Sequence, residues 1–161
     1  MITIRTAAIN DLDAIASVEA ECFPKAEAAT REQFAARLER YPSHFWLMFD
    51  GEKLIAFVDG LVTDEDTLTD YMYSHPEIHN ERGKWQMIFG VNTLQEYRRK
   101  GYASELMRRA VQDSHEQGRL GLVLTCKAEL VHWYARLGFV SEGVSESVHG
   151  GAVWYSMRLT F

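Results

Sequence analysis

The chain has 161 residues, of which 47% are apolar, and this is typical of one folded domain with its own hydrophobic core. Its net charge of −6 argues against a nucleic-acid-binding protein with one wholly basic face. The two cysteines, Cys22 and Cys126, are too few for a disulfide framework, and no apolar run is long enough to cross a membrane. We therefore expect a single domain over residues 1–161 that works in the cytoplasm, without a membrane or nucleic-acid partner.

The first part of the chain predicts a strand followed by two helices. Residues 2–5 alternate between apolar and polar side chains, which is typical of a strand. Asn10 or Asp11 can cap the first helix, because both side chains accept hydrogen bonds from free amides at a helix start. The capping-box pattern Thr30–Gln33 opens the second helix. Pro42 ends that helix, because proline disfavours helical conformation in the residue before it.

A β-hairpin and an acidic stretch follow. His44–Phe49 and Leu54–Val62 are strand-like runs, and Asp50-Gly51 between them is a strong hairpin signal. The stretch Leu54–Glu81 holds seven acidic residues and no Lys or Arg. We expect it to form a loop with a short helix around Thr67–Tyr73. Its charge either steers a cationic molecule toward the protein or simply forms a solvated face.

The centre of the chain predicts a strand, a basic turn and a helix. Met87–Val91 is a short apolar run that predicts a buried strand. The turn Arg98–Ala103 carries consecutive cationic residues and a glycine. The apolar face of the helix that follows consists of Ala103, Leu106, Met107, Ala110 and Val111. Unpaired amides at the helix start and the positive end of the helix dipole make this turn suited to a phosphate group.

The C-terminal part contributes the remaining elements. Leu122–Cys126 predicts a buried strand, and Glu129–Leu137 predicts a short helix that stops at Gly138. Phe139–Val144 and Ala152–Leu159 predict a final pair of strands. The complete order predicts an α/β fold, with a mixed, mainly antiparallel sheet of about seven strands and helices on both faces.

Two motifs resemble those of a known family. The turn Arg98–Ala103, RRKGYA, is similar to the Arg/Gln-x-x-Gly-x-Gly/Ala signature of the GNAT N-acetyltransferases. Trp133–Phe139, WYARLGF, resembles the family's tyrosine helix that ends in Gly-Phe. The spacing of the motifs and the order of the elements agree over nearly the whole chain. Within the family, Leu124–Tyr134, Leu54–Val58 and Glu19–Lys25 resemble the serotonin (arylalkylamine) N-acetyltransferase branch.

The resemblance implies that the chain binds acetyl-CoA as its acetyl donor. In the family the pyrophosphate lies on the amides of the turn, and the pantetheine arm bonds the preceding strand like an added strand. The residues implied to bind the coenzyme are Phe89, Gly90, Val91, Arg98, Arg99, Lys100, Gly101, Tyr102, Ala103, Ser104 and Tyr134. The alternative for the turn alone is an ordinary basic loop that caps a helix, and the second motif favours coenzyme binding.

Tyr134, in the second motif, is the candidate general acid. Acetyl transfer to an amine releases CoA as a thiolate, which must take up a proton. A phenol with an ordinary pKa of about 10 can supply that proton when it lies near the sulfur. The alternative is a buried tyrosine that only packs its ring against the sheet. The place of Tyr134 in the motif favours the catalytic interpretation.

The sequence does not name the base. The arylalkylamine branch carries histidines at the positions that Trp85 and Met87 occupy here, and neither of these side chains accepts a proton. Another group, a water relay or an amine that arrives neutral must take over this role. The candidate groups are His75, His79, His132 and Asp59. Each of them is more often a structural or exposed residue than a base, and His132 is expected to face away from Tyr134 on a helix.

The resemblance also locates the site of the accepting amine. It implies that Phe23, Pro24, Phe89 and Thr125 line this site. An apolar pocket there suits an aryl or alkyl amine.

A covalent intermediate and a metal site are weaker possibilities. Cys126 ends a buried strand, and we interpret it as a small buried hydrophobe rather than as a nucleophile that carries the acetyl group. His75 and His79 are spaced like a metal-binding pair, but Pro76 interrupts any helix that would align them. We therefore expect no metal.

We predict an N-acetyltransferase that moves an acetyl group from acetyl-CoA to a primary amine, a small (aryl)alkylamine, by direct attack in a ternary complex. One alternative is an acetyltransferase for protein N-termini or lysine side chains. The other is a non-catalytic regulatory module that binds acetyl-CoA. Exposed edge strands in such a fold are compatible with a monomer or a homodimer.

Overall fold

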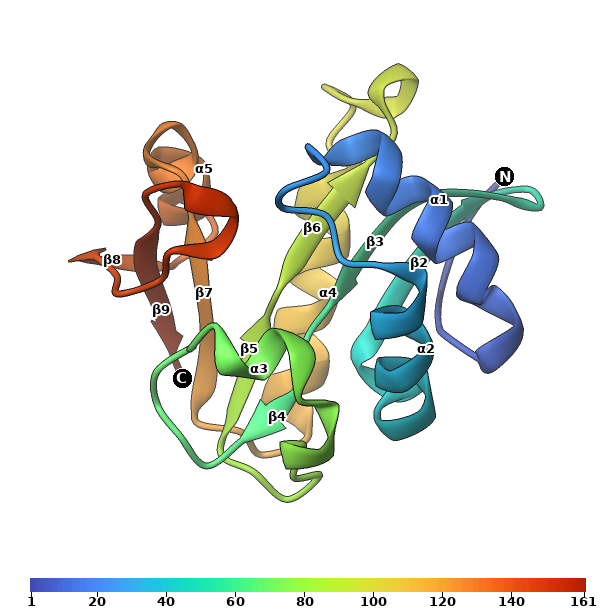
Figure 1. The fold of residues 1–161 in the computed structure, drawn as a ribbon. Coiled ribbons are helices and arrows are strands. Elements are labelled where there is room, and N and C mark those ends of the chain that lie inside the picture. Colours follow the sequence, from blue (N-terminus) through green and yellow to red (C-terminus); the bar gives the residue numbers. More distant parts are fainter.

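The computed structural model describes all residues from 1 to 161, as nine strands and five α-helices joined by loops and short 3-10 turns (Figure 1). The strands are β1 (Ile2–Thr6), β2 (Phe45–Asp50), β3 (Lys53–Asp59), β4 (Val62–Thr63), β5 (Trp85–Ile88), β6 (Gly90–Thr93), β7 (Gly121–Cys126), β8 (Val140–Val144) and β9 (Tyr155–Thr160). The helices are α1 (Leu12–Cys22), α2 (Arg31–Arg40), α3 (Tyr71–Ser74), α4 (Tyr102–Glu116) and α5 (Val131–Arg136). None of these helices is both long enough and apolar enough to span a bilayer.

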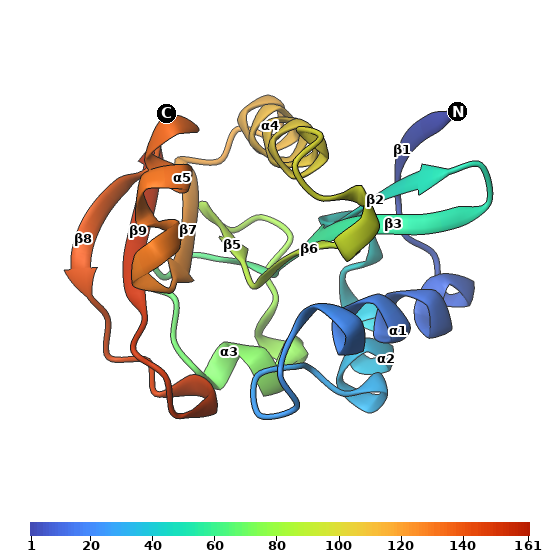
Figure 2. The ribbon, with the colours of Figure 1, turned by 90° about the horizontal axis from the view of Figure 1, so that it is seen from above.

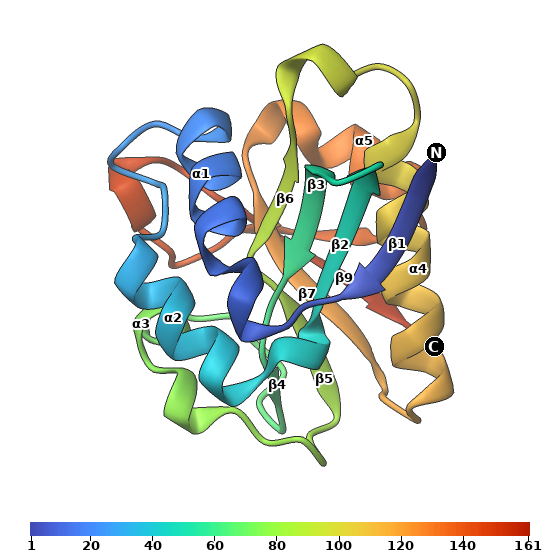
Figure 3. The same ribbon diagram turned by 90° about the vertical axis from the view of Figure 1, so that its right-hand side faces the viewer.

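The strands form two sheets, in the orders β1-β2-β3-β6 and β4-β5-β7-β9-β8. All neighbouring strands are antiparallel except β5 and β7. Helices α1 and α2 cover one side of the sheets and α4 covers the other (Figures 2 and 3). The predicted α/β fold, with a mixed and mainly antiparallel arrangement and helices on both faces, is therefore confirmed.

Each face of the sheets carries its own apolar core. On the side of α1 and α2, the largest buried side chains include Ile15, Phe34, Phe45, Phe57 and Met72. On the side of α4, they include Trp46, Met48, Ile55, Leu106 and Met107. The alternation of side chains along a strand sends successive residues of β2 to opposite cores, which is why Phe45–Phe49 is a continuous apolar run.

The structure has more strands than the sequence predicts, because two of the expected strands break. Leu54–Val62 was expected as one strand, but β3 ends at Asp59 and β4 starts at Val62 in the other sheet. A Cβ atom at Gly60 would lie 1.7 Å from the carbonyl oxygen of Met87, so only glycine allows the two backbones to approach this closely. The break occurs at this crossing.

The second break falls at Phe89, between β5 and β6. Strand β5 pairs in parallel with β7, whereas β6 pairs antiparallel with β3. The chain therefore changes sheet at Phe89, whose amide donates to the Asp59 carbonyl at 2.7 Å. Beyond this point β6 and β7 diverge, and β6 is left as an edge strand of its sheet.

The predicted helix boundaries are confirmed in part. Thr30 and Gln33 form the expected capping box, with the Gln33 amide donating to Thr30 Oγ1 at 3.1 Å. The helix expected around Thr67–Tyr73 is displaced toward the C-terminus and spans only Tyr71–Ser74. The helix that contains Tyr134 is preceded by a 3-10 turn, and Gly138 after it has a φ of 102°, as expected of a glycine that ends a helix.

Candidate active site

The turn before α4 presents a row of free backbone amides. Arg99 and Gly101 have φ angles of 64° and 80°, which curl the turn so that its amides face outward. The first amide in the helix that donates to a backbone carbonyl is that of Glu105, which bonds Gly101 at 3.0 Å. The amides from Arg99 to Ser104 donate to no other backbone group. They are available for a phosphate group, as expected, and the helix dipole adds to the attraction.

A cavity of about 270 Å³, open to solvent on one side, lies near the point where β6 and β7 diverge. Its lining includes all of the following residues expected to bind the amine or the acyl end of the coenzyme: Phe23, Pro24, Phe89, Gly90, Val91, Thr125 and Tyr134. The cationic side chains of Arg98, Arg99 and Lys100 are not part of it, and all three are exposed. The cavity and the turn are therefore separate parts of one surface, joined by β6.

Tyr134 reaches the cavity from helix α5. Its side chain is only 6% exposed, and its ring packs edge-on against Trp133 and Phe139. Burial, with a smaller effect of Cys126, raises the pKa of the Tyr134 phenol. The phenol is therefore protonated at neutral pH and holds a proton to donate, although its raised pKa makes it a weaker acid than an ordinary tyrosine. Burial also raises the pKa of the Cys126 thiol to about 11, so this cysteine is a poor nucleophile.

Asp59, one of the candidate bases, is held in a buried ion pair. Its Oδ2 accepts from Arg37 Nη1 at 3.0 Å, and both side chains are almost completely buried. Arg37 also donates to the Tyr73 carbonyl at 2.9 Å and lies over the ring of Phe89. Burial raises the pKa of Asp59 in spite of Arg37, which acts in the opposite direction. Asp59 serves as the counterion of Arg37.

A glutamate that the sequence did not single out lies in the cavity. Glu19, on the buried face of α1, is 6% exposed, and its Oε2 accepts from the Ala29 amide at 2.8 Å. Its Oε1 is buried and has no hydrogen-bond partner. Burial and the negative charge of Asp59 raise the pKa of Glu19 to about 7, although the Ala29 amide and Arg37 oppose this. The sequence signal was its spacing of four residues from Ile15, which places an acid on the apolar face of the helix.

Two loops that are distant in sequence lie over the cavity, the α1–α2 loop and the loop between β8 and β9. We call these two loops the roof. His149 Nε2 donates to the Glu27 carbonyl at 2.7 Å. Lys127 pairs with the Glu27 carboxylate at 2.8 Å. A Cβ at Gly150 would lie 2.5 Å from the Glu27 side chain, so the two loops are in close contact. Figure 2 shows them meeting beside α3.

Several aromatic side chains line the walls under the roof. The Tyr73 ring packs against Phe89 at a centroid distance of 4.9 Å and against His149 at 4.8 Å. Its hydroxyl lies 3.4 Å from Thr125 Oγ1, and burial raises its pKa to about 12. Trp154 closes another side and donates its indole N–H to the His149 carbonyl at 2.8 Å.

The model of the acetyltransferase (GNAT) family matches residues 12–139 of the chain. The chain belongs to the acetyltransferase (GNAT) family. As a member of this family it is an N-acetyltransferase that uses acetyl-CoA as its acetyl donor. The free amides of the turn and the open edge of β6 fit this coenzyme.

Solved structures with the same fold include several GNAT proteins. The loading GNATL domain of CurA from Lyngbya majuscula is 16% identical, with a TM-score of 0.85 over 99% of this chain and 98% of that one. The ribosomal-protein-S18-alanine N-acetyltransferase from Escherichia coli is 20% identical, with a TM-score of 0.74 over 99% and 94%. The PaiA N-acetyltransferase from Thermoplasma acidophilum, in complex with coenzyme A, is 17% identical, with a TM-score of 0.74 over 100% and 99%. No curated protein matches the sequence.

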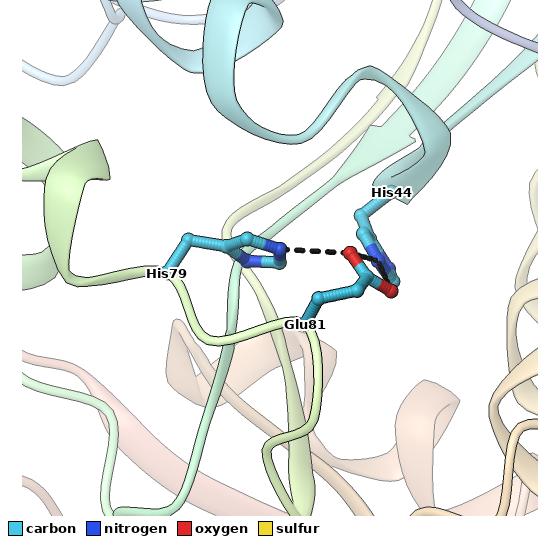
Figure 4. A group of neighbouring side chains, drawn as sticks. All are labelled: His44, His79 and Glu81. Carbon is cyan, nitrogen blue, oxygen red and sulfur yellow. Dashed lines mark hydrogen bonds and ion pairs between the residues drawn. The ribbon is translucent and has the colours of Figure 1, made fainter.

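The histidines considered as bases in this GNAT protein all lie outside the cavity lining. His132 is exposed on α5. His75 stacks on Tyr71 and bonds the Glu77 carboxylate at 2.7 Å. His79 joins His44 and Glu81 in a separate group of side chains, which we call the histidine cluster (Figure 4).

The histidine cluster has the composition of a metal site, but both ring nitrogens of His79 are engaged in hydrogen bonds. Gln86 donates its amide to the Gly60 and Met87 carbonyls, so its Oε1 faces His44 Nδ1 at 2.8 Å and that nitrogen carries a proton. His79 Nδ1 accepts from the Val62 amide at 3.0 Å, so a neutral His79 carries its proton on Nε2. That nitrogen lies 3.0 Å from Glu81 and is a donor rather than a metal ligand.

Proposed function

We propose that the chain transfers the acetyl group of acetyl-CoA to a small primary amine with an aryl or alkyl substituent. The observation that carries this proposal is the roofed cavity of about 270 Å³ at the divergence of β6 and β7, whose lining includes several aromatic side chains. A cavity of this kind suits a compact apolar group with one polar end. The resemblance of Leu124–Tyr134 to the arylalkylamine branch points to the same class of acceptor.

The coenzyme is proposed to lie along β6 and to end at the turn before α4. Strand β6 pairs with β3 on one edge only, so its other edge offers backbone groups to the pantetheine arm at Phe89, Gly90 and Val91. The pyrophosphate then meets the free amides from Arg99 to Ser104. Arg98, Arg99 and Lys100 add positive charge on the solvent side of the same turn.

The charges of the cavity favour a cationic acceptor. Arg37 and Asp59 compensate each other, as do Lys127 and Glu27, which leaves the charge of Glu19 in excess. Aromatic faces attract an ammonium group in addition, by cation–π interaction. A protonated primary amine therefore finds a negative group at the polar end of the cavity and apolar walls for its substituent.

Tyr134 is proposed to protonate the leaving thiolate. Its phenol is protonated at neutral pH, and it reaches the same cavity as Gly90 and Val91. A donor placed at the sulfur lowers the barrier to breaking the carbon–sulfur bond. The backbone amides of β6 are suited to stabilise the oxyanion of the tetrahedral intermediate.

A peptide acceptor is the competing proposal, because a protein with the same fold acetylates a ribosomal protein. The roof disfavours a peptide, since its bonds between Glu27 and His149 and between Glu27 and Lys127 close the side on which a chain would continue.

The test is CoA release measured with a panel of arylalkylamines, alkylamines, polyamines, aminoglycosides and N-terminal peptides. We expect turnover with arylalkylamines or alkylamines. Turnover with peptides alone would overturn the proposal.

A further inference from the structure

We infer that Glu19 is the general base that removes the proton from the incoming ammonium group. This inference rests on the proposed function, because it assigns a role within the same cavity. It also supplies the base that is missing at Trp85 and Met87, the two positions at which the arylalkylamine branch has histidines.

The geometry of Glu19 differs from that of a structural carboxylate. Oε2 is fixed by the Ala29 amide at 2.8 Å, which anchors the side chain to the start of the segment before α2. Oε1 is buried, has no partner, and would lie 3.4 Å from a Cβ placed on Gly90. Gly90 belongs to the segment proposed to bind the pantetheine arm. The free oxygen therefore faces the backbone beside which the thioester is proposed to lie.

The absence of a side chain at Gly90 keeps this position open. A Cβ there would lie 3.0 Å from Asn92 Nδ2 and 3.4 Å from Asp59 Oδ1. Asn92 itself is 1% exposed, and neither polar atom of its side chain has a partner. Glu19 Oε1 and the Asn92 side chain thus face each other beside Gly90, where Asn92 lowers the pKa of Glu19 although neither makes a hydrogen bond of ordinary geometry.

The groups that surround Glu19 set its proton affinity. Burial is the largest effect and, with Asp59 on β3, raises the pKa of Glu19 to about 7, while the Ala29 amide, Arg37 on α2 and Asn92 on β6 act to lower it. Cys22 on α1, Glu27 and His149 of the roof, and Lys127 after β7 also line the cavity. A base with a pKa near the working pH is efficient, because it is ionised in most molecules and still binds a proton well.

The proton balance is simple. The Glu19 carboxylate takes one proton from R–NH3⁺ and later passes it to water. The neutral nitrogen attacks the thioester carbonyl carbon, and the carbon–sulfur bond breaks as the thiolate takes the phenolic proton of Tyr134. The nitrogen then loses a second proton, which restores the Tyr134 phenol. The products are the amide, CoA–SH and one proton released to solvent.

The experiment compares wild type with Glu19→Gln in the CoA-release assay across pH 5.5–9. For an alkylamine, we expect the variant to lose about 100-fold in turnover at pH 7.5, the lower range for the loss of a general base. We also expect the rise in kcat/KM through about pH 7 to disappear. The acetyl-CoA affinity, measured by calorimetry, and the circular dichroism spectrum should both match those of wild type. This result would show that the variant is folded.

A second acceptor separates proton removal from packing. An amine of low pKa, such as an aniline or a hydrazine, is already neutral at pH 7.5 and needs no base. We expect Glu19→Gln to acetylate it at nearly the wild-type rate. The matched control is Glu21→Gln, the same change at an exposed position of the same helix. It should leave the rates of acetylation of both acceptors unchanged.

The outcomes separate this inference from the proposed function. If wild type acetylates alkylamines and Glu19→Gln does so with the same pH profile, Glu19 is not the base and the proposed function stands. If Glu19→Gln loses the same factor in turnover with the alkylamine and with the aniline, the inference is overturned as well, since this result indicates damage to the site. If wild type acetylates only peptides, the proposed function fails, and the same pH comparison on the peptide decides the role of Glu19. A wild type that acetylates nothing overturns both.

Discussion

Two glutamates of this protein, Glu19 in the cavity and Glu81 in the histidine cluster, have opposite surroundings. Both Glu81 oxygens are in use, since His44 and His79 lie 3.0 Å away and Arg119 donates at 3.2 Å. Burial acts to raise the pKa of Glu81, but the bonds from His79 and His44 outweigh it and lower the pKa. Glu19 keeps one oxygen unpaired, and its pKa is raised. A glutamate stabilises the fold where both of its oxygens accept hydrogen bonds, as in Glu81. It can take part in chemistry where one oxygen has no hydrogen-bond partner, as in Glu19.

The largest expected effect lies in the cavity, at Tyr134. Tyr134→Phe removes the proton donor but keeps the ring that packs against Trp133 and Phe139. We expect kcat to fall by about 10²- to 10⁴-fold, the usual contribution of a general acid, with acetyl-CoA affinity nearly unchanged. Steady-state kinetics and calorimetry measure the two quantities. An unchanged kcat would show that another group protonates the thiolate.

The next effect concerns the ion pair beside Glu19. Arg37→Met removes the counterion of Asp59, which is 1% exposed, and leaves its charge buried without compensation. We expect the free energy of unfolding to fall by about 3–5 kcal/mol, as for other broken buried pairs. Urea denaturation at pH 7 measures it. The double variant Arg37→Met/Asp59→Asn should recover part of the loss, and a double variant as unstable as the single one would contradict this explanation.

Glu19→Gln should stabilise the protein at high pH while it reduces turnover. The pKa of Glu19 is raised from 4.5 to about 7 on folding, so its stabilising contribution is complete below 4.5 and is lost as the pH rises through 7. Above pH 7 the buried carboxylate costs on the order of 3 kcal/mol, since one pKa unit corresponds to about 1.4 kcal/mol. The variant avoids this cost. Urea denaturation at pH 8 and pH 4 should show a gain at pH 8 that disappears at pH 4.

The smallest effect, of opposite sign, is expected for Glu81→Gln. The folded pKa of Glu81 is lowered, so its contribution to stability is present above its ordinary pKa and is lost as the pH falls through the folded value. Because its side chain is 62% exposed, solvent screens the interaction, and we expect a loss of about 1 kcal/mol at pH 7. Turnover should stay at the wild-type level. A gain in the stability of Glu81→Gln at pH 7 would contradict the proposed difference between Glu81 and Glu19.

The local parts of the molecule could be predicted from the sequence. The turn of free amides before α4, the capping box at Thr30 and the helix-ending Gly138 depend on residues close together in the chain, and their signals are complete within a few positions. Family resemblance added Tyr134 and the residues expected around the amine.

The remaining features depend on contacts between distant segments. The break at Gly60 results from its approach to Met87, and the change of sheet at Phe89 depends on the different partners of β5 and β6. Glu19 could be recognised as an acid on an apolar helix face, but not as a group with a free oxygen beside Gly90. The histidine cluster likewise required the fold, since His44 and Glu81 are far apart in sequence.

The contact between the two loops of the roof affects the order in which the parts of the molecule fold. The bond between His149 and the Glu27 carbonyl spans 122 residues, so it closes one of the longest loops in the chain. Contacts of such high sequence separation form late in folding, because their loop-closure entropy must be overcome first. During synthesis, the segment that contains His149 leaves the ribosome after every other wall of the cavity except Trp154. A growing chain therefore completes the turn before α4 early and the roofed cavity last, when the final hairpin is in place.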